Sequence, residues 1–261
     1  MKLRVRSELV YTFPQDTQAI VAIHVARTPD QAILSESLTI SPDGPILQDM
    51  ADHHGERRFR AAFEGETSIV YEATIDNAKP RLLSPDARLE PWLELPPPVL
   101  ESLLPSRYCP SDKFMSFAHR EFGDLTPGGT QVLAVLDWIY NHVDYVPGSS
   151  HGGTTAENTF VDRAGICRDF THLGISICRA LNVPARAVSA YAWQLDPPDF
   201  HAVFEVYLES VWWLVDATRL VPVENLVRVA TGRDAADIAF LTTSGSCDLI
   251  NQVVSVELLN A

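Results

Sequence analysis

Residues 159–181 read TFVDRAGICRDFTHLGISICRAL, in which a loop containing Gly165 and Cys167 turns into an apolar helix. From Phe170 onward, apolar or small residues recur every three or four positions. This spacing predicts a helix with one buried face about three turns long. We expect Cys167 to open this helix and the helix to be a core element of the fold.

The position of Cys167 favours a reactive sulfur. Gly165 has no Cβ, so a second backbone or a substrate can approach closely there. The first free N–H groups of the helix point at the sulfur, and the positive end of the helix dipole stabilises a thiolate. A buried, inert thiol is the alternative, and it is the commoner state of an isolated cysteine. The choice between the two therefore depends on residues elsewhere in the chain.

Composition limits the partners of this protein. The chain has 261 residues and a formal charge of -14. Nucleic acid and anionic lipid both need clustered Lys and Arg, so we expect neither as a partner. The N-terminus alternates in the manner of a strand rather than a signal peptide, and no apolar run approaches membrane-spanning length. These features predict a soluble, cytoplasmic protein.

The cysteines and histidines do not predict a metal site. The four cysteines show neither a CxxC motif nor the Cys/His spacing of zinc ligands, and they are too few for a disulfide framework. His53 and His54 are adjacent in a polar turn, which is more typical of solvated surface. We therefore expect four free thiols, no cofactor, and an activity that survives chelators such as EDTA. The four are Cys109, Cys167, Cys178 and Cys247.

The whole chain is expected to divide into three parts. Residues 1–94 read as a small β-sandwich of short strands between turns, with strands expected at 3–13, 19–25, 35–40, 57–63 and 67–75. Residues 95–110 read as a proline-rich linker, and residues 111–261 as the catalytic domain. This domain is expected to begin with helices at 112–122 and 127–143. Thr126 is the expected N-cap of the second helix, with Pro127 at its first position.

Strands expected at 185–193, 200–208 and 211–217 follow the cysteine helix. If Glu209 and Ser210 form a two-residue turn, one face of the resulting hairpin is apolar. The other face then carries both His201 and Asp216 as diagonal neighbours, roughly 7 Å apart at their β-carbons. A slip of one residue would move Asp216 to the apolar face, so this inference depends on the turn.

A cysteine at a helix start, with a histidine and an aspartate paired on a hairpin, fits nucleophilic acyl chemistry. The imidazole takes the thiol proton, the carboxylate fixes the imidazole tautomer, and the helix N-terminus helps to hold the oxyanion. Taken singly, His201 reads as a hydrogen-bonded strand residue and Asp216 as a turn residue. Together with Cys167 they predict a catalytic triad.

These residues resemble the transglutaminase-like superfamily, and specifically the bacterial proteins with a β-rich region ahead of a transglutaminase-like domain. The resemblance rests on four segments: GICRDFTHL at 165–173, VPAR at 183–186, HAVFEV at 201–206 and DAT at 216–218. Two positions depart from the family pattern. Val203 stands where a tryptophan is common, which is expected to change the substrate cleft, and Ala217 stands where a proline is usual.

The resemblance implies an α+β protein with a papain-like catalytic domain, in which the cysteine helix packs on an antiparallel sheet. It also implies that Cys167, His201 and Asp216 form a thioester with a carbonyl of a peptide or protein substrate. Water would resolve the thioester in a cysteine protease or amidase, and an amine would resolve it in a transglutaminase. We favour hydrolysis, because the chain shows no obvious amine site or acidic calcium loop. A peptide-binding or assembly module without turnover is the third possibility.

Arg168 and Asp169 follow the cysteine in the same motif. They either brace the motif by hydrogen bonds or form a plain salt bridge at the helix start.

Overall fold

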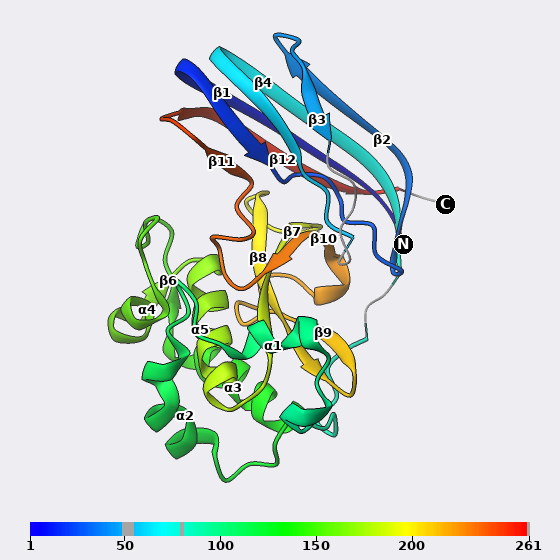
Figure 1. The fold of residues 1–261 in the computed structure, drawn as a ribbon. Helices are drawn as coiled ribbons and strands as arrows, with labels where there is room; N and C mark the ends of the chain where they lie inside the picture. Colours follow the sequence, from blue (N-terminus) through cyan, green and yellow to red (C-terminus); the bar gives the residue numbers. More distant parts are fainter. Residues whose placement is uncertain (49–54, 79–80, 260–261) are drawn as a thin grey trace.

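The computed structural model describes residues 1–48, 55–78 and 81–259. A large sheet lies on one side of the molecule, and a smaller sheet with helices on one of its faces lies on the other (Figure 1). His53 and His54, for which no role is predicted, fall outside the described residues. No helix in the described part of the chain is long and apolar enough to cross a membrane.

The large sheet combines strands from both ends of the chain. Its six strands are β1 (Lys2–Val21), β2 (Gln31–Ser41), β3 (Ile46–Gln48), β4 (Phe59–Asn77), β11 (Leu241–Thr243) and β12 (Asp248–Leu258). Both β11 and β12 pair with β1, so the last strands of the chain lie beside the first (Figure 1). Alternate residues of β1 are buried from Leu3 to Phe13, which gives this sheet one inward face.

This arrangement differs from the expected β-sandwich and from the expected domain ranges. The chain does not turn at residues 14–16, because β1 continues through them with a bulge between Phe13 and Thr17. The resulting long strands form a single sheet, whose buried face packs on residues from the rest of the protein instead of on a second sheet formed by residues 1–94. The Ser7 and Tyr191 hydroxyls meet there at 3.0 Å. Residues 241–258, expected in the domain 111–261, belong to this N-terminal sheet.

The smaller sheet is antiparallel, in the order β10-β7-β8-β9. Its strands are β7 (Ala185–Ala192), β8 (Phe200–Leu208), β9 (Val211–Val215) and β10 (Leu226–Gly232). The α-helices are α1 (Pro97–Leu100), α2 (Met115–Phe122), α3 (Gly129–His142), α4 (Ala156–Asp162) and α5 (Cys167–Ala180). The described residues also contain four 3-10 helices and a short parallel pair of strands: η1 (Trp92–Glu94), η2 (Glu101–Leu103), η3 (Ser111–Phe114), η4 (Val223–Asn225), β5 (Asp144–Tyr145) and β6 (Ala164–Gly165).

The cysteine helix α5 packs directly on β8. A Cβ on Gly174 would lie 2.5 Å from the Phe204 ring, so glycine at this position allows the helix to approach the sheet closely. The α+β class, with the cysteine helix on an antiparallel sheet, is thus confirmed.

Helix α3 begins two residues later than expected. Gly128, rather than Thr126, is its N-cap, with φ +109 and no side-chain cap. A Cβ on Gly128 would lie 2.2 Å from the Ala87 carbonyl oxygen, which accepts a hydrogen bond from Gly129 N at 2.8 Å. The segment around Ala87 therefore docks against the helix start and fixes where the helix begins.

A buried ion network ties the two sheets together. Glu205 of β8 accepts hydrogen bonds from Arg186 Nε and Nη2 at 2.9 and 2.8 Å and from Arg228 Nε at 2.6 Å. Arg228 also donates to Asp30 Oδ2, just before β2, at 2.7 Å. The two guanidinium groups therefore share one buried carboxylate, and Arg228 has Asp30 as a second partner.

Replacing Glu205 with alanine should destabilise the protein by about 3–5 kcal/mol, because two buried guanidinium groups would lose their shared partner. Urea denaturation of the variant and the wild type would measure the change in unfolding free energy. Glu157→Ala is the control, since it breaks an exposed pair with Lys113 and should have little effect. Equal effects of the two substitutions would show that the network does not contribute as described.

Candidate active site

The hairpin of β8 and β9 has the predicted register. Phe204 pairs with Val215, and Leu208 pairs with Val211. Glu209 and Ser210 form the turn, with φ angles of 53 and 62. Positive φ at both turn residues matches the right-handed twist of the flanking strands.

The hairpin brings His201 and Asp216 into contact. His201 is the second residue of β8 and Asp216 directly follows β9. His201 Nε2 lies 2.9 Å from Asp216 Oδ2, and the two residues are 1% and 8% exposed. Because a carboxylate only accepts hydrogen bonds, Nε2 carries the proton in this pair.

Thr218 holds the aspartate in place. Its backbone N–H and its hydroxyl donate to Asp216 Oδ1 at 2.8 and 2.7 Å, which leaves Oδ2 for His201. Sequence reasoning assigned no role to Thr218, although an aspartate two residues before a threonine is a common pattern for such a turn.

The other ring nitrogen of His201 is available to Cys167. His201 Nδ1 is buried and has no hydrogen-bond partner among the described residues. Burial alone would lower the pKa of His201, but Asp216 and the nearby Cys167 raise it to about 10. The imidazole is therefore stabilised in its positive form next to a half-buried thiol at the first residue of α5.

We expect Cys167 to react with iodoacetamide well below neutral pH. Asp216 and Cys167 raise the pKa of His201, so the imidazolium is favoured next to the sulfur and attracts a thiolate there. Cys109 and Cys178 should stay unmodified in the folded protein, because burial raises the pKa of each thiol to about 12. Peptide mapping by mass spectrometry after alkylation at several pH values would check this. Reaction of Cys167 only at alkaline pH would contradict it.

Hydrogen bonds brace the loop before Cys167. Asp169 is fully buried, and its Oδ2 accepts from Ile166 N at 2.9 Å while its Oδ1 accepts from the Ser150 hydroxyl at 2.9 Å. Arg168 Nη2 donates to the same hydroxyl at 2.6 Å. A Cβ on Gly165 would lie 2.7 Å from the Asp169 Cβ, so the close approach at this glycine is made by a side chain. Arg168 Nε also lies 3.8 Å from Asp169 Oδ1, so the structure has both the predicted bracing hydrogen bonds and the predicted salt bridge at the helix start.

Tyr145 lies next to Cys167 and was not singled out from the sequence. The strands β5 and β6 pair Tyr145 with Gly165, two residues before the cysteine. Burial, followed by the charge of Cys167, raises the pKa of Tyr145 to about 12. The phenol therefore stays protonated at neutral pH and can donate a hydrogen bond beside the sulfur.

A cavity of about 470 Å³ opens at Cys167 and His201. Its floor includes Ser189 and Ala202 of the smaller sheet. The large sheet, its β11–β12 loop and the segment before β11 also line it, through Tyr11, Leu241, Gln252, Cys247 and Phe240. The N-terminal sheet therefore contributes directly to the space in front of the sulfur.

Val203 does not contribute to this cavity. It is buried on the other face of the small sheet, in a cluster with Val188 and Leu214. Valine at the position of the family tryptophan therefore belongs to the core and does not change the substrate cleft, contrary to expectation. The neighbouring Ala202 does line the cavity.

His172, also within the motif, is a structural histidine. Its Nε2 accepts a hydrogen bond from Ala235 N at 3.1 Å, and its ring stacks on Tyr108 at 5.1 Å. Burial lowers the pKa of His172 to about 3, so the ring stays neutral.

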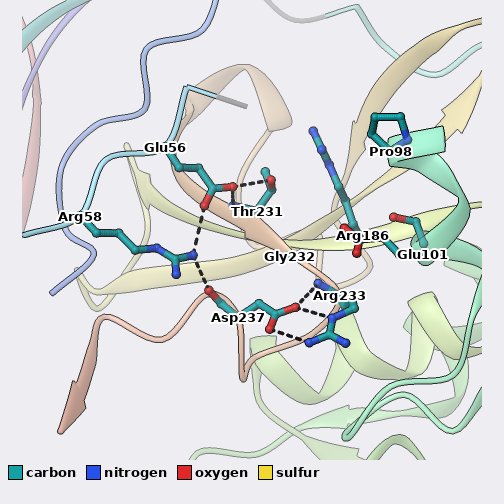
Figure 2. A pocket seen from close by; sticks show the side chains of 10 residues that line it. Glu56, Arg58, Pro98, Glu101, Arg186, Thr231, Gly232, Arg233 and Asp237 are labelled. Atoms are coloured by element: carbon teal, nitrogen blue, oxygen red, sulfur yellow. Dashed lines mark hydrogen bonds and ion pairs between the residues drawn. The ribbon is translucent and has the colours of Figure 1, made fainter. Parts of the chain in front are cut away.

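A second cavity, of about 230 Å³, shares no lining residue with the first. Figure 2 shows two charge pairs in its lining: Arg58 contacts Glu56, and Arg233 contacts Asp237. The charges of these four side chains are therefore already paired and are not free to bind a charged ligand.

Within residues 1–48, 55–78 and 81–259, no group of three or more His, Cys, Asp or Glu side chains is placed to hold a metal ion. The independence of the activity from metals stays a prediction.

Comparison with known proteins defines the family. The family model of the transglutaminase-like superfamily matches residues 117–217, and that of the bacterial transglutaminase N-terminal domain matches residues 1–83. A crystal structure named a "putative cysteine protease" from Cytophaga hutchinsonii is 41% identical, with a TM-score of 0.92. The match covers 100% of this chain and 91% of that one. The chain therefore belongs to the transglutaminase-like superfamily.

More distant similarities were also found. An uncharacterized protein of Mycobacterium leprae is 26% identical over 174 residues, which are 60% of this chain and 61% of that protein. The match thus spans less than two thirds of that relative. The periplasmic domain of TgpA from Pseudomonas aeruginosa is 17% identical with a TM-score of 0.44, over 84% of this chain and 90% of that domain.

Proposed function

We propose that the protein is a cysteine protease or amidase that cleaves a peptide or amide bond through a thioester on Cys167. The observation that carries the proposal is the orientation of His201. Its Nε2 is engaged by Asp216 Oδ2 at 2.9 Å, and its buried Nδ1 remains for a thiol at the start of α5. Membership of the transglutaminase-like superfamily supports the same chemistry.

The proposed reaction has two stages. In the first, the Cys167 thiolate, whose proton is held on His201 Nδ1, forms a bond with the substrate carbonyl carbon, and the carbonyl oxygen becomes negative. The negative carbonyl oxygen lies at the N-terminus of α5, where free backbone N–H groups stabilise it. Nδ1 then protonates the leaving amine, the C–N bond breaks, and a thioester remains.

In the second stage, water attacks the thioester. His201 Nδ1 takes a proton from the water, the C–S bond breaks, and the carboxylic acid leaves while the sulfur is restored. A primary amine in place of water would give a new amide, which is the transglutaminase reaction. The substrate would be a peptide or protein in either case, and the cytoplasmic location stays a prediction.

An intact-mass experiment tests the proposal. The protein is incubated with a peptide pool, quenched with acid, and weighed, with Cys167→Ala as the control. A mass increase in the wild type alone, mapped to Cys167, would support the thioester and identify the acyl group. Acid or amide products in solution would then show whether water or an amine resolves it. A protein that retains peptides without any covalent adduct would instead be a binding module.

A further inference from the structure

Asp199 places a carboxylate at the mouth of the cavity that contains Cys167. It precedes His201 by two residues and is exposed at the cavity rim. Its Oδ1 accepts hydrogen bonds from Phe200 N at 2.7 Å and from Gln252 Nε2, on β12 of the large sheet, at 2.5 Å. Its Oδ2 makes no hydrogen bond to a described residue. One oxygen is thus fixed by both sheets and the other is free to bind a ligand.

No arginine or lysine of the described chain forms an ion pair with Asp199. Arg168 also lines the cavity, but its guanidinium donates to the Ser150 hydroxyl and to the His151 carbonyl. Partial desolvation raises the pKa of Asp199, while hydrogen bonds and the positive charge of His201 act in the opposite direction. A positive group on the substrate would therefore gain a partly desolvated carboxylate as its partner.

The wall behind this carboxylate is apolar. The Phe200 and Phe240 rings stack with their centroids 3.9 Å apart, and Ile238 lines the same cavity. An alkyl chain can lie on such a surface while its charged end reaches the rim, as lysine and arginine side chains commonly do.

The position of Asp199 beside His201 indicates which part of the substrate it meets. In the proposed reaction, the imidazole protonates the leaving amine and later deprotonates the incoming nucleophile. A group next to the imidazole therefore faces the leaving group or the acyl acceptor. Asp199 precedes His201 by two residues and lines the same cavity, which places its carboxylate on this side.

We propose that Asp199, with the wall of Phe200 and Phe240, forms a subsite that selects a positively charged side chain on an alkyl stem in the leaving group or acyl acceptor. The inference rests on the proposed thioester chemistry. It identifies peptides with lysine or arginine directly after the cleaved bond as preferred substrates, and amines of the same kind as preferred acceptors.

A partition experiment, in which an amine competes with water for the acyl-enzyme, tests this subsite separately from the formation of the thioester. p-Nitrophenyl acetate forms the acyl-enzyme, which is then offered water together with arginine amide or with citrulline amide, its uncharged isostere. The α-amine nitrogen forms the new amide bond and the C–S bond breaks, while the amine proton passes through His201 Nδ1 to the sulfur. Mass spectrometry measures the ratio of amide to acid for each acceptor.

We expect arginine amide to capture the acyl group about three- to ten-fold better than citrulline amide, a preference that should fall as ionic strength rises. Asp199→Asn should bring the preference to near unity, because its side-chain oxygen can still accept from Phe200 and Gln252 but the charge is lost. Asp196→Asn, in the same exposed loop and outside the cavity lining, is the matched control and should keep the preference.

A wild-type preference near unity would overturn the inference, as would a preference that persists in Asp199→Asn. Acyl-enzyme detected by intact mass in either case would show that the thioester chemistry stands and that only the subsite is misassigned. The absence of any acyl adduct on the wild type would overturn both.

Discussion

Replacing Cys167 with alanine is expected to abolish amide or ester turnover and acyl transfer while the protein stays folded. The sulfur is the proposed nucleophile, and without it neither the thioester nor the His201 proton transfer has a reacting partner. By analogy with the loss of a serine-protease nucleophile, the turnover rate should fall by roughly 10⁶-fold. The side chain is half-buried at the first residue of α5, so its removal leaves only a small packing change. Turnover assays and thermal denaturation of the same preparation would measure both effects.

Cys178→Ala is the matched control, because Cys178 lies on the same helix and is fully buried. Its removal leaves a small cavity and should cost about 1 kcal/mol of stability without changing the chemistry. Equal loss of activity in the two variants would show that the nucleophile has been misidentified.

The parts of the site that sequence reasoning predicted correctly depend on local structure. The helix start at Cys167 follows from a glycine, a loop and an apolar period within about twenty residues. The hairpin register follows from a two-residue turn at Glu209 and Ser210 and from alternation on either side of it, so the contact between His201 and Asp216 could be predicted. Neither inference needed the position of a distant segment.

The parts that were not predicted depend on pairing between the two ends of the chain. Strand β12 pairs with β1, so that Leu3 lies opposite Leu258. The alternation of apolar and polar residues predicts that each of the two segments is a strand. It does not predict which other strand pairs with it. For the same reason, the contributions of Tyr11 and Gln252 to the cavity at Cys167 could not be predicted. Gln252 of β12 donates a hydrogen bond to Asp199. The contact that holds Asp199 at the cavity therefore could not be predicted without knowing that β12 pairs with β1.

Asp216→Asn should lower the turnover rate by about 10⁴-fold, the loss seen when the corresponding carboxylate of a serine triad becomes an amide. The hydrogen bonds of Thr218 explain why. Both Thr218 donors occupy Oδ1, so the asparagine would keep its oxygen there and turn its NH₂ group toward His201 Nε2. Nε2 would then have to accept, and the proton would move to Nδ1. An imidazole in that tautomer cannot take the Cys167 proton.

The same substitution should move the alkylation profile of Cys167 to higher pH. Asp216 is a main cause of the raised pKa of His201, so its neutral replacement makes the imidazolium less favourable and weakens its attraction for the thiolate. Thr218→Val is the control, since it removes one hydroxyl donor but keeps the carboxylate and the backbone N–H, and it should cost far less activity. Iodoacetamide kinetics across pH and steady-state turnover of both variants would test this. Unchanged activity and an unchanged alkylation profile in Asp216→Asn would show that the His201 and Asp216 contact is structural and has no part in the chemistry.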